Sequence, residues 1–270
     1  MQTLLPAILA CVLYLIGAGL QWAVLHRDLP SKRTLVIAVG LLAICAHGYF
    51  AWHQIFTGKG IDIGALPLAS VIALAIAGTI ILSSLRRPVE NLVIVLFPLA
   101  AIIIVLAIIL PGRMTPRTDI PRGIVTHIVL AVVAYSMLTI AAFQAMLLSF
   151  GDYKLKHRSL SVLRNLPPLQ TMEGLLFELL WLGLIFMSLS IVTGFLFLEW
   201  DYKNPAVPAL MQHAAMTLAA WIVFAVLLWG RYRLGWRGAV ASRWTLTGFA
   251  LLAIGYFGSK FVLGMMTGHA

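Results

Sequence analysis

The residues most able to do chemistry in this 270-residue chain are histidines, because an imidazole can bind a metal ion or exchange a proton near neutral pH. Four of its seven histidines lie inside or at the edges of long apolar stretches: His47, His53, His127 and His213. Polar groups are costly inside a membrane and usually face the interior of a helix bundle or a cavity. We therefore treat these four as candidates for a site within a bundle.

The composition defines the elements that must position them. Hydrophobic residues make up 61% of the chain and charged residues 10%, which indicates a polytopic α-helical membrane protein. The apolar runs are continuous over about 20 residues, which excludes a transmembrane β-barrel with its shorter alternating strands. The predicted spans are Leu4–Leu25, Leu35–Phe56, Leu66–Leu85, Asn91–Leu110, Gly123–Phe150, Leu175–Leu198, Ala209–Trp229 and Thr245–Met265.

We expect an all-α bundle of eight transmembrane helices that forms a single transmembrane domain over residues 1–270. The longest connector, Gly151–Gly174, is too short to bury a core of its own. Connectors one, three, five and seven hold thirteen Lys and Arg residues, and connectors two, four and six hold five. The positive-inside rule then places both termini on the outer, periplasmic side of a bacterial inner membrane. Anionic lipid explains the basic inner loops without a nucleic-acid partner.

This orientation sorts the four histidines by depth. His53, His127 and His213 come from three different spans and share one shallow outer layer, whereas His47 lies about 14 Å below the outer surface. Imidazoles that reach one depth from separate helices are the arrangement that a bundle uses for a metal ion or a heme. The alternative is that each histidine only hydrogen-bonds to a neighbouring helix. His47 and His53 are about 120° apart around their helix, so both cannot point squarely at one ligand.

Two outer connectors add further candidates. Arg113, Arg117 and Arg122 make connector four strongly basic, although the orientation rule does not require it. Guanidinium groups suit planar carboxylates, so a ligand with two propionates is one partner, and lipid phosphate is the alternative. In connector six, Trp200 lies before His213, but tryptophans near the membrane interface are also expected as an aromatic belt; a contact of Trp200 with a porphyrin face follows only from the family resemblance described below. No motif for hydrolysis or nucleotide binding is found, so we expect no enzymatic activity of those kinds.

Four stretches carry a family resemblance. They are HIVLAVVAYSMLTIAAFQAMLL at His127–Leu148, the helix leading into Trp200–Asp201, the hairpin with GWRG at Arg231–Phe261, and Ala46–Ser70 around His47. Together they resemble the cytochrome c assembly (CcsA-type) family of heme-handling membrane proteins, and most closely its HemX/YpjD-like branch. In that family, helices like the first begin with an outer heme histidine, and His47 falls at the position of a membrane histidine.

The resemblance implies a heme-binding protein that handles or transports non-covalent heme b during cytochrome c biogenesis, with other maturation proteins as partners. Only Trp200–Asp201 remains of the tryptophan-rich loop of the family, and His269 matches its second outer histidine poorly. Depth instead favours His213 as the partner of His127 on one heme iron. His53 is then the reserve ligand, and the three arginines would bind the propionates.

Two other functions remain open from the residues. One is a b-type heme protein of the membrane that passes electrons between quinol and an outer partner, and the other is a transporter or structural subunit without heme. Glu178, about one turn into span six, is predicted to face the bundle and to be either protonated or paired, because a carboxylate exposed to lipid is costly.

Overall fold

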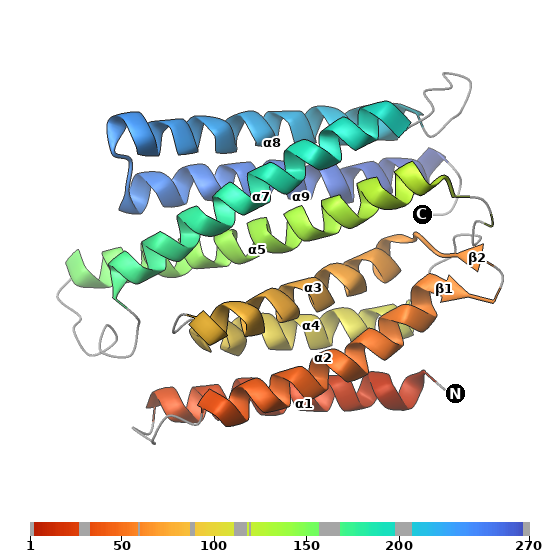
Figure 1. Ribbon diagram of the computed structural model, residues 1–270, viewed down its shortest axis with the longest axis horizontal. Helices are drawn as coiled ribbons and strands as arrows, with labels where there is room; N and C mark the ends of the chain where they lie inside the picture. The colour runs from red at the N-terminus through yellow and green to blue at the C-terminus, as the bar shows by residue number, and fades with distance from the viewer. Residues whose placement is uncertain are drawn as a thin grey trace. The chain divides into compact units, whose positions relative to one another are not determined.

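The computed structural model describes residues 3–26, 33–58, 60–86, 90–110, 118, 120–156, 168–197 and 207–266 (Figure 1). Arg113, Arg117 and Trp200 lie outside these residues. The described residues form eight long helices: α1 (Leu4–His26), α2 (Arg33–Ile55), α3 (Ala65–Arg86), α4 (Val93–Ile109), α5 (Arg122–Lys156), α7 (Leu169–Phe197), α8 (Val207–Leu234) and α9 (Gly238–Met266). The all-α polytopic membrane fold is confirmed; the side on which the termini lie stays a prediction.

Length and composition identify the helices that suit a membrane. Among the described residues, α1, α2, α3, α5, α7 and α8 are long and apolar enough to cross one. Helix α4 has 17 residues and contains Pro98, at the short end of the roughly 17–25 residues of a spanning helix. Large side chains such as Leu82 and Phe257 remain exposed along these helices, as expected where lipid is the solvent.

The helices extend beyond the predicted spans where the sequence becomes polar. Helix α5 continues past Phe150 to Lys156, and α7 begins at Leu169 rather than Leu175. Hydropathy marks only the part of a helix that lies in hydrocarbon, whereas its backbone hydrogen bonds can continue into the polar region. The structure also contains elements that the sequence did not predict: a short antiparallel hairpin of β1 (Phe56–Thr57) and β2 (Gly60–Ile61), and the 3₁₀ helix η1 (Glu90–Leu92).

The chain divides into two compact units. The N-terminal unit holds α1 to α4 with the hairpin, and α1 packs against both α2 and α4. Its interior contains the fully buried Tyr14 and Phe97, whose ring centroids are 4.9 Å apart. The side chains of His47 and Ser70 are also buried there. This unit therefore has a polar centre within an apolar core.

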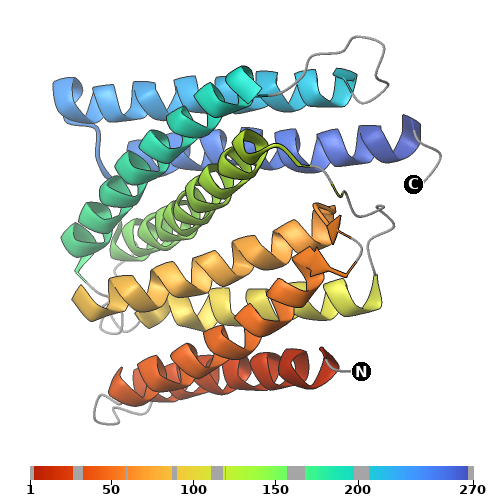
Figure 2. The ribbon, with the colours of Figure 1, turned by 45° about the vertical axis from the view of Figure 1, so that its right-hand side comes forward.

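The C-terminal unit holds α5, α7, α8 and α9. Its most extensive helix pair is α5 with α7, followed by α8 with α9, which Figures 1 and 2 show side by side. The turn between α8 and α9 is tight, and Gly235 and Gly238 have φ values of 67° and 52° there. Glycine adopts such values without the steric cost that other residues have. The turn brings the start of α9 back along α8.

Candidate functional site

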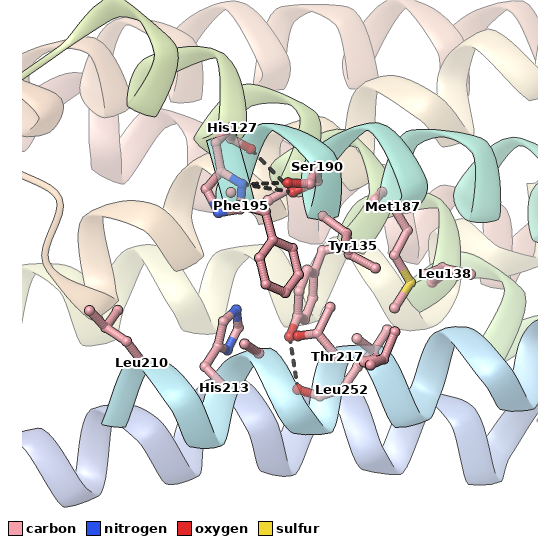
Figure 3. A pocket seen from close by; sticks show the side chains of 16 residues that line it. His127, Tyr135, Leu138, Met187, Ser190, Phe195, Leu210, His213, Thr217 and Leu252 are labelled. Atoms are coloured by element: carbon pink, nitrogen blue, oxygen red, sulfur yellow. Dashed lines mark hydrogen bonds between the residues drawn. The ribbon is translucent and has the colours of Figure 1, made fainter. Parts of the chain in front are cut away.

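A cavity of about 120 Å³ lies within the C-terminal unit, lined by residues of α5, α7, α8 and α9 (Figure 3). Most of the lining side chains are apolar. The polar ones are His127 and Tyr135 of α5, Ser190 of α7, and His213 and Thr217 of α8. Two of the four predicted histidines are thus brought to one cavity from different helices.

His127 lies in the second turn of α5 and is half-buried. Its Nδ1 atom is 2.7 Å from the backbone carbonyl oxygen of Ser190, and the Ser190 hydroxyl is 3.2 Å from the same nitrogen. A carbonyl oxygen only accepts hydrogen bonds, so Nδ1 carries the proton and donates it. In the tautomer with the proton on Nδ1, Nε2 carries the lone pair that could bind a ligand. Metal-binding histidines are commonly oriented in this way by a carbonyl acceptor.

Gly194 provides the space for the His127 ring. A Cβ atom at position 194 would lie 3.0 Å from Cε1 and 3.1 Å from Nδ1 of His127. Ser190 and Gly194 are four residues apart on α7, and small residues at this spacing let membrane helices approach closely. Sequence reasoning missed both residues, although this small-residue spacing was a signal that could have found them.

His213 reaches the same cavity from the second turn of α8. Its Nδ1 atom is buried, and Figure 3 shows its ring directed toward the space that His127 and Phe195 also border. His127 and His213 therefore line one cavity from separate helices, and their binding to one iron stays a prediction. Neither residue is near the other in the sequence.

Hydrogen bonds between helices fix the walls of the cavity. The Tyr135 hydroxyl donates to the carbonyl oxygen of Leu252 at 2.8 Å and so joins α5 to α9. Trp221 Nε1 donates to the Ser188 hydroxyl at 2.8 Å and joins α8 to α7. Few polar partners exist within apolar helices, so each of these bonds restricts how the helices can pack.

The other predicted histidines lie in the N-terminal unit, in different surroundings. His47 is fully buried, with Nδ1 3.0 Å from the Tyr14 hydroxyl and Nε2 3.0 Å from the Ser70 hydroxyl. Both of its ring nitrogens are therefore engaged. His53 is exposed, and its ring centroid is 4.6 Å from that of Tyr49.

The structure also describes two charged residues about which the sequence made predictions, Arg122 and Glu178. Arg122 is exposed at the first position of α5. Glu178 is exposed on α7, so the prediction that its side chain faces the bundle is wrong, whereas the prediction that it is protonated or paired stays a prediction. Two other residues of α7, Glu173 and Phe177, contact Arg231 of α8: Glu173 by an ion pair and Phe177 through the face of its ring. Glu178 lies about 100° further around the helix than Phe177.

The donor set of the cavity fits heme iron. The histidines His127 and His213 offer two imidazoles, and the surrounding wall is apolar. Within the described ranges, no group of three or more His, Cys, Asp or Glu side chains gathers that could hold a bare metal ion. A pair of imidazoles suits a metal whose other ligands are supplied by a macrocycle.

Comparison with known proteins identifies the family of the chain. Residues 35–266 match the family described as "Cytochrome C assembly protein". The chain is 28% identical over 260 residues to "Inner membrane protein YpjD" of Escherichia coli K12, covering 95% of this chain and 97% of YpjD. It is 26% identical over 164 residues to "Protein HemX" of Brevibacillus brevis, covering 58% of each chain. No solved structure matches it. Because the family match extends over most of the sequence, the chain belongs to the cytochrome c assembly protein family.

Proposed function

We propose that this protein binds heme b non-covalently in the bacterial inner membrane and holds or transports it for cytochrome c assembly. The observation that carries the proposal is the bond from His127 Nδ1 to the Ser190 carbonyl, because it leaves Nε2 as a lone-pair donor at the cavity. No cysteine lines the cavity, so the side chains there offer no thiol for a covalent attachment.

The two histidines have distinct roles in the proposal. His127 from α5, oriented by the Ser190 carbonyl, and His213 from α8 would each give one imidazole nitrogen to the iron of a bound heme. Tyr135 and the apolar lining would exclude water from that ligand. Trp200, in the segment between α7 and α8, would cover one face of the ring.

The relatives support the location and the pathway. YpjD is described as an inner membrane protein, and a member of the cytochrome c assembly family would meet heme and other maturation proteins in that membrane. The protein performs no covalent chemistry in this proposal. Its task is to keep a sparingly soluble cofactor in a defined orientation.

The alternative of an electron carrier across the membrane has less support. Such a carrier needs a second iron site at another depth, and His47 was the deep candidate. Its two ring nitrogens are taken by Tyr14 and Ser70. Our proposal therefore gives His47 a structural role. In a transporter without heme, the orientation that the Ser190 carbonyl gives His127 would serve no ligand.

Single replacements by Ala test the proposal. Purified His127→Ala and His213→Ala variants should each lose most of the heme that the unchanged protein retains at equal yield, and the absorbance spectrum should lose its low-spin bis-imidazole form. His53→Ala, from an exposed position in the other unit, is the matched control and should retain heme. Full retention of heme in both the His127→Ala and the His213→Ala variants would contradict the proposal.

The arginines of connector four are proposed to bind the heme propionates. Arg122 is exposed at the start of the helix that carries His127, five residues earlier. Replacing Arg113, Arg117 and Arg122 together by Gln should weaken heme retention, because guanidinium groups pair with carboxylates through charge-assisted hydrogen bonds. Unchanged affinity would leave lipid phosphate as their partner.

A further inference from the structure

A basic surface lies at the end of the C-terminal unit where α5 and α8 end and where α7 and α9 begin (Figure 1). The cavity histidines are in the second turns of α5 and α8, so this surface is at the opposite end of the unit. Its described cations are Lys154, Arg231, Arg233, Arg237 and Arg243. The described carboxylates at this end are Asp152 and Glu173. Such an excess of cations favours an anionic partner.

The turn between α8 and α9 holds Arg237 in place. The ring of Trp236 packs on Gly230, where a Cβ atom would lie 2.4 Å from it, and stacks on Trp244 with 5.2 Å between the ring centroids. The Trp236 amide donates to the Gly230 carbonyl at 3.3 Å, and Arg231 Nη1 donates to the Trp236 carbonyl at 3.3 Å. The residue that follows Trp236 is therefore carried by an anchored backbone.

Glu173 fixes the direction of the Arg237 guanidinium. Its Oε1 accepts a hydrogen bond from Arg237 Nε at 3.1 Å and lies 2.6 Å from Arg231 Nη1. No second carboxylate of the described residues pairs with Arg237, whose side chain is 69% exposed. A guanidinium has five N–H donors, so the bond from Nε leaves the four on the Nη atoms. A planar fork of this kind matches the oxygens of a phosphate group.

The neighbouring side chains place this surface at the level of lipid headgroups. Tyr232, directly before Arg233 in the last turn of α8, is 84% exposed, and Tyr153 of α5 is exposed at the same end. Aromatic side chains of this kind are typical of the boundary between hydrocarbon and water. The charge distribution predicts that this end faces the cytoplasm, where the leaflet carries anionic lipid.

The second carboxylate, Asp152, has another partner. A Cβ atom at Gly238 would lie 3.0 Å from its Oδ2, so the carboxylate is at the first residue of α9. The positive end of the helix dipole favours a negative charge there. A phosphate at this end is therefore assigned to the arginines rather than to the start of α9.

We propose that Arg237, oriented by Glu173, binds the phosphate of an anionic phospholipid, with Arg233 as a second cation. The net positive surface selects an anionic headgroup, because the ammonium group of a zwitterionic lipid would face cations. The turn that carries Arg237 is fixed before the lipid arrives, so little conformational freedom is lost on binding. This site is at the other end of the unit from the proposed heme site and does not depend on it.

Native mass spectrometry of the detergent-purified protein tests the proposal by counting bound lipid. The unchanged protein should retain phosphatidylglycerol in preference to phosphatidylcholine. Arg237→Lys keeps the charge but loses the planar fork, so it should bind phosphatidylglycerol about fivefold more weakly, as the loss of one hydrogen bond implies. Arg243→Lys is the matched control: Arg243 is exposed on α9 and makes no ion pair with Glu173, so its replacement should leave binding unchanged.

Glu173→Gln separates an oriented site from a diffuse basic surface. The variant removes a negative charge, so a diffuse surface would bind more phosphatidylglycerol. If Glu173 orients Arg237, binding should instead fall although the net charge becomes more positive. Thermal unfolding checks that the variant is folded, and Arg237→Lys carries the test if it is not.

Three results would overturn the proposal. They are stronger binding of phosphatidylglycerol to folded Glu173→Gln, equal effects of Arg237→Lys and Arg243→Lys, and equal retention of the two lipids by the unchanged protein. Displacement of phosphatidylglycerol by an equal concentration of glycerol 3-phosphate would also contradict it, because the arginines would then bind a soluble anion rather than a lipid.

Discussion

At the scale of single residues, two histidines of this chain differ by what their ring nitrogens contact. His127 donates from Nδ1 to the Ser190 carbonyl and presents Nε2 to a cavity. His47 is fully buried, and both of its nitrogens lie 3.0 Å from hydroxyl groups. The first arrangement is one that metal-binding histidines commonly have, and the second satisfies a polar group inside an apolar core.

Gly194→Ala should disturb the His127 ring without removing it. The added methyl group would lie 3.0 Å from Cε1 and 3.1 Å from Nδ1, so the ring must shift and its bond to the Ser190 carbonyl must weaken. We expect bound heme to change from a low-spin to a mixed-spin absorbance spectrum. Gly78→Ala is the matched control, because a Cβ there has no neighbouring atom within 4 Å. An unchanged spectrum in Gly194→Ala would show that this orientation does not matter.

Tyr14→Phe should destabilise the N-terminal unit and leave heme binding unchanged. It removes the hydroxyl group that pairs with His47 Nδ1 inside the core. Losing such a bond costs about 0.5–2 kcal/mol, with values near the lower end inside membranes. Thermal unfolding in detergent measures the loss, and Tyr49→Phe, at a 48% exposed position, is the control. A loss of heme at equal protein yield would instead place His47 in the heme site.

At the scale of elements, α7 contacts both α5 and α8, through residues at several positions along its length. Ser190 and Gly194 lie against His127 of α5, and Ser188 accepts a hydrogen bond from Trp221 of α8. At the start of α7, Glu173 Oε1 is 2.6 Å from Arg231 Nη1 of α8 and 3.1 Å from Arg237 Nε in the following turn. These ion pairs join the start of α7 to the end of α8 and to the turn that follows it.

Double-mutant cycles should separate the two ion pairs of Glu173. The Glu173 and Arg231 side chains are 15% and 28% exposed, whereas Arg237 is 69% exposed. We expect a coupling energy of about 1–2 kcal/mol for Glu173→Gln with Arg231→Gln, because a poorly solvated pair loses more when one partner is removed. Glu173→Gln with Arg237→Gln should give about 0–1 kcal/mol, as solvated pairs do. Equal couplings measured by chemical denaturation would contradict this ranking.

At the scale of the whole molecule, the distribution of charge predicts the orientation. Thirteen Lys and Arg residues in connectors one, three, five and seven, against five in the others, place both termini outside. Alkaline phosphatase fused after Ala270 should therefore be active, because the enzyme matures only outside the cytoplasm. A fusion to green fluorescent protein at the same point is the control and should not fluoresce when exported unfolded. A terminal reporter that is active only in the cytoplasm would reject the orientation.

The sequence by itself determined the fold class and the approximate position of each helix. Apolar runs of spanning length are a local property, because each helix satisfies its backbone hydrogen bonds internally and needs only its own residues to be recognised. The predicted starts at Leu4 and Leu66 lie within a residue of α1 and α3 in the structure. The sequence also predicted that His127 and His213 lie at one depth, because depth depends only on distance along a helix. Both line one cavity of the structure, and their binding to one iron stays a prediction.

Only the tertiary structure decided which nitrogens are available and what surrounds them. The acceptor of His127 is a backbone carbonyl 63 residues away, and the partners of His47 are hydroxyls 33 and 23 residues away. Such contacts depend on how each helix is rotated about its axis, and helices that are apolar on all sides give no sequence signal for that rotation. For the same reason the exposure of Glu178 and the position of Phe195 at the cavity could not be read from the sequence. Helix packing sets them, and packing depends on many weak contacts made at once.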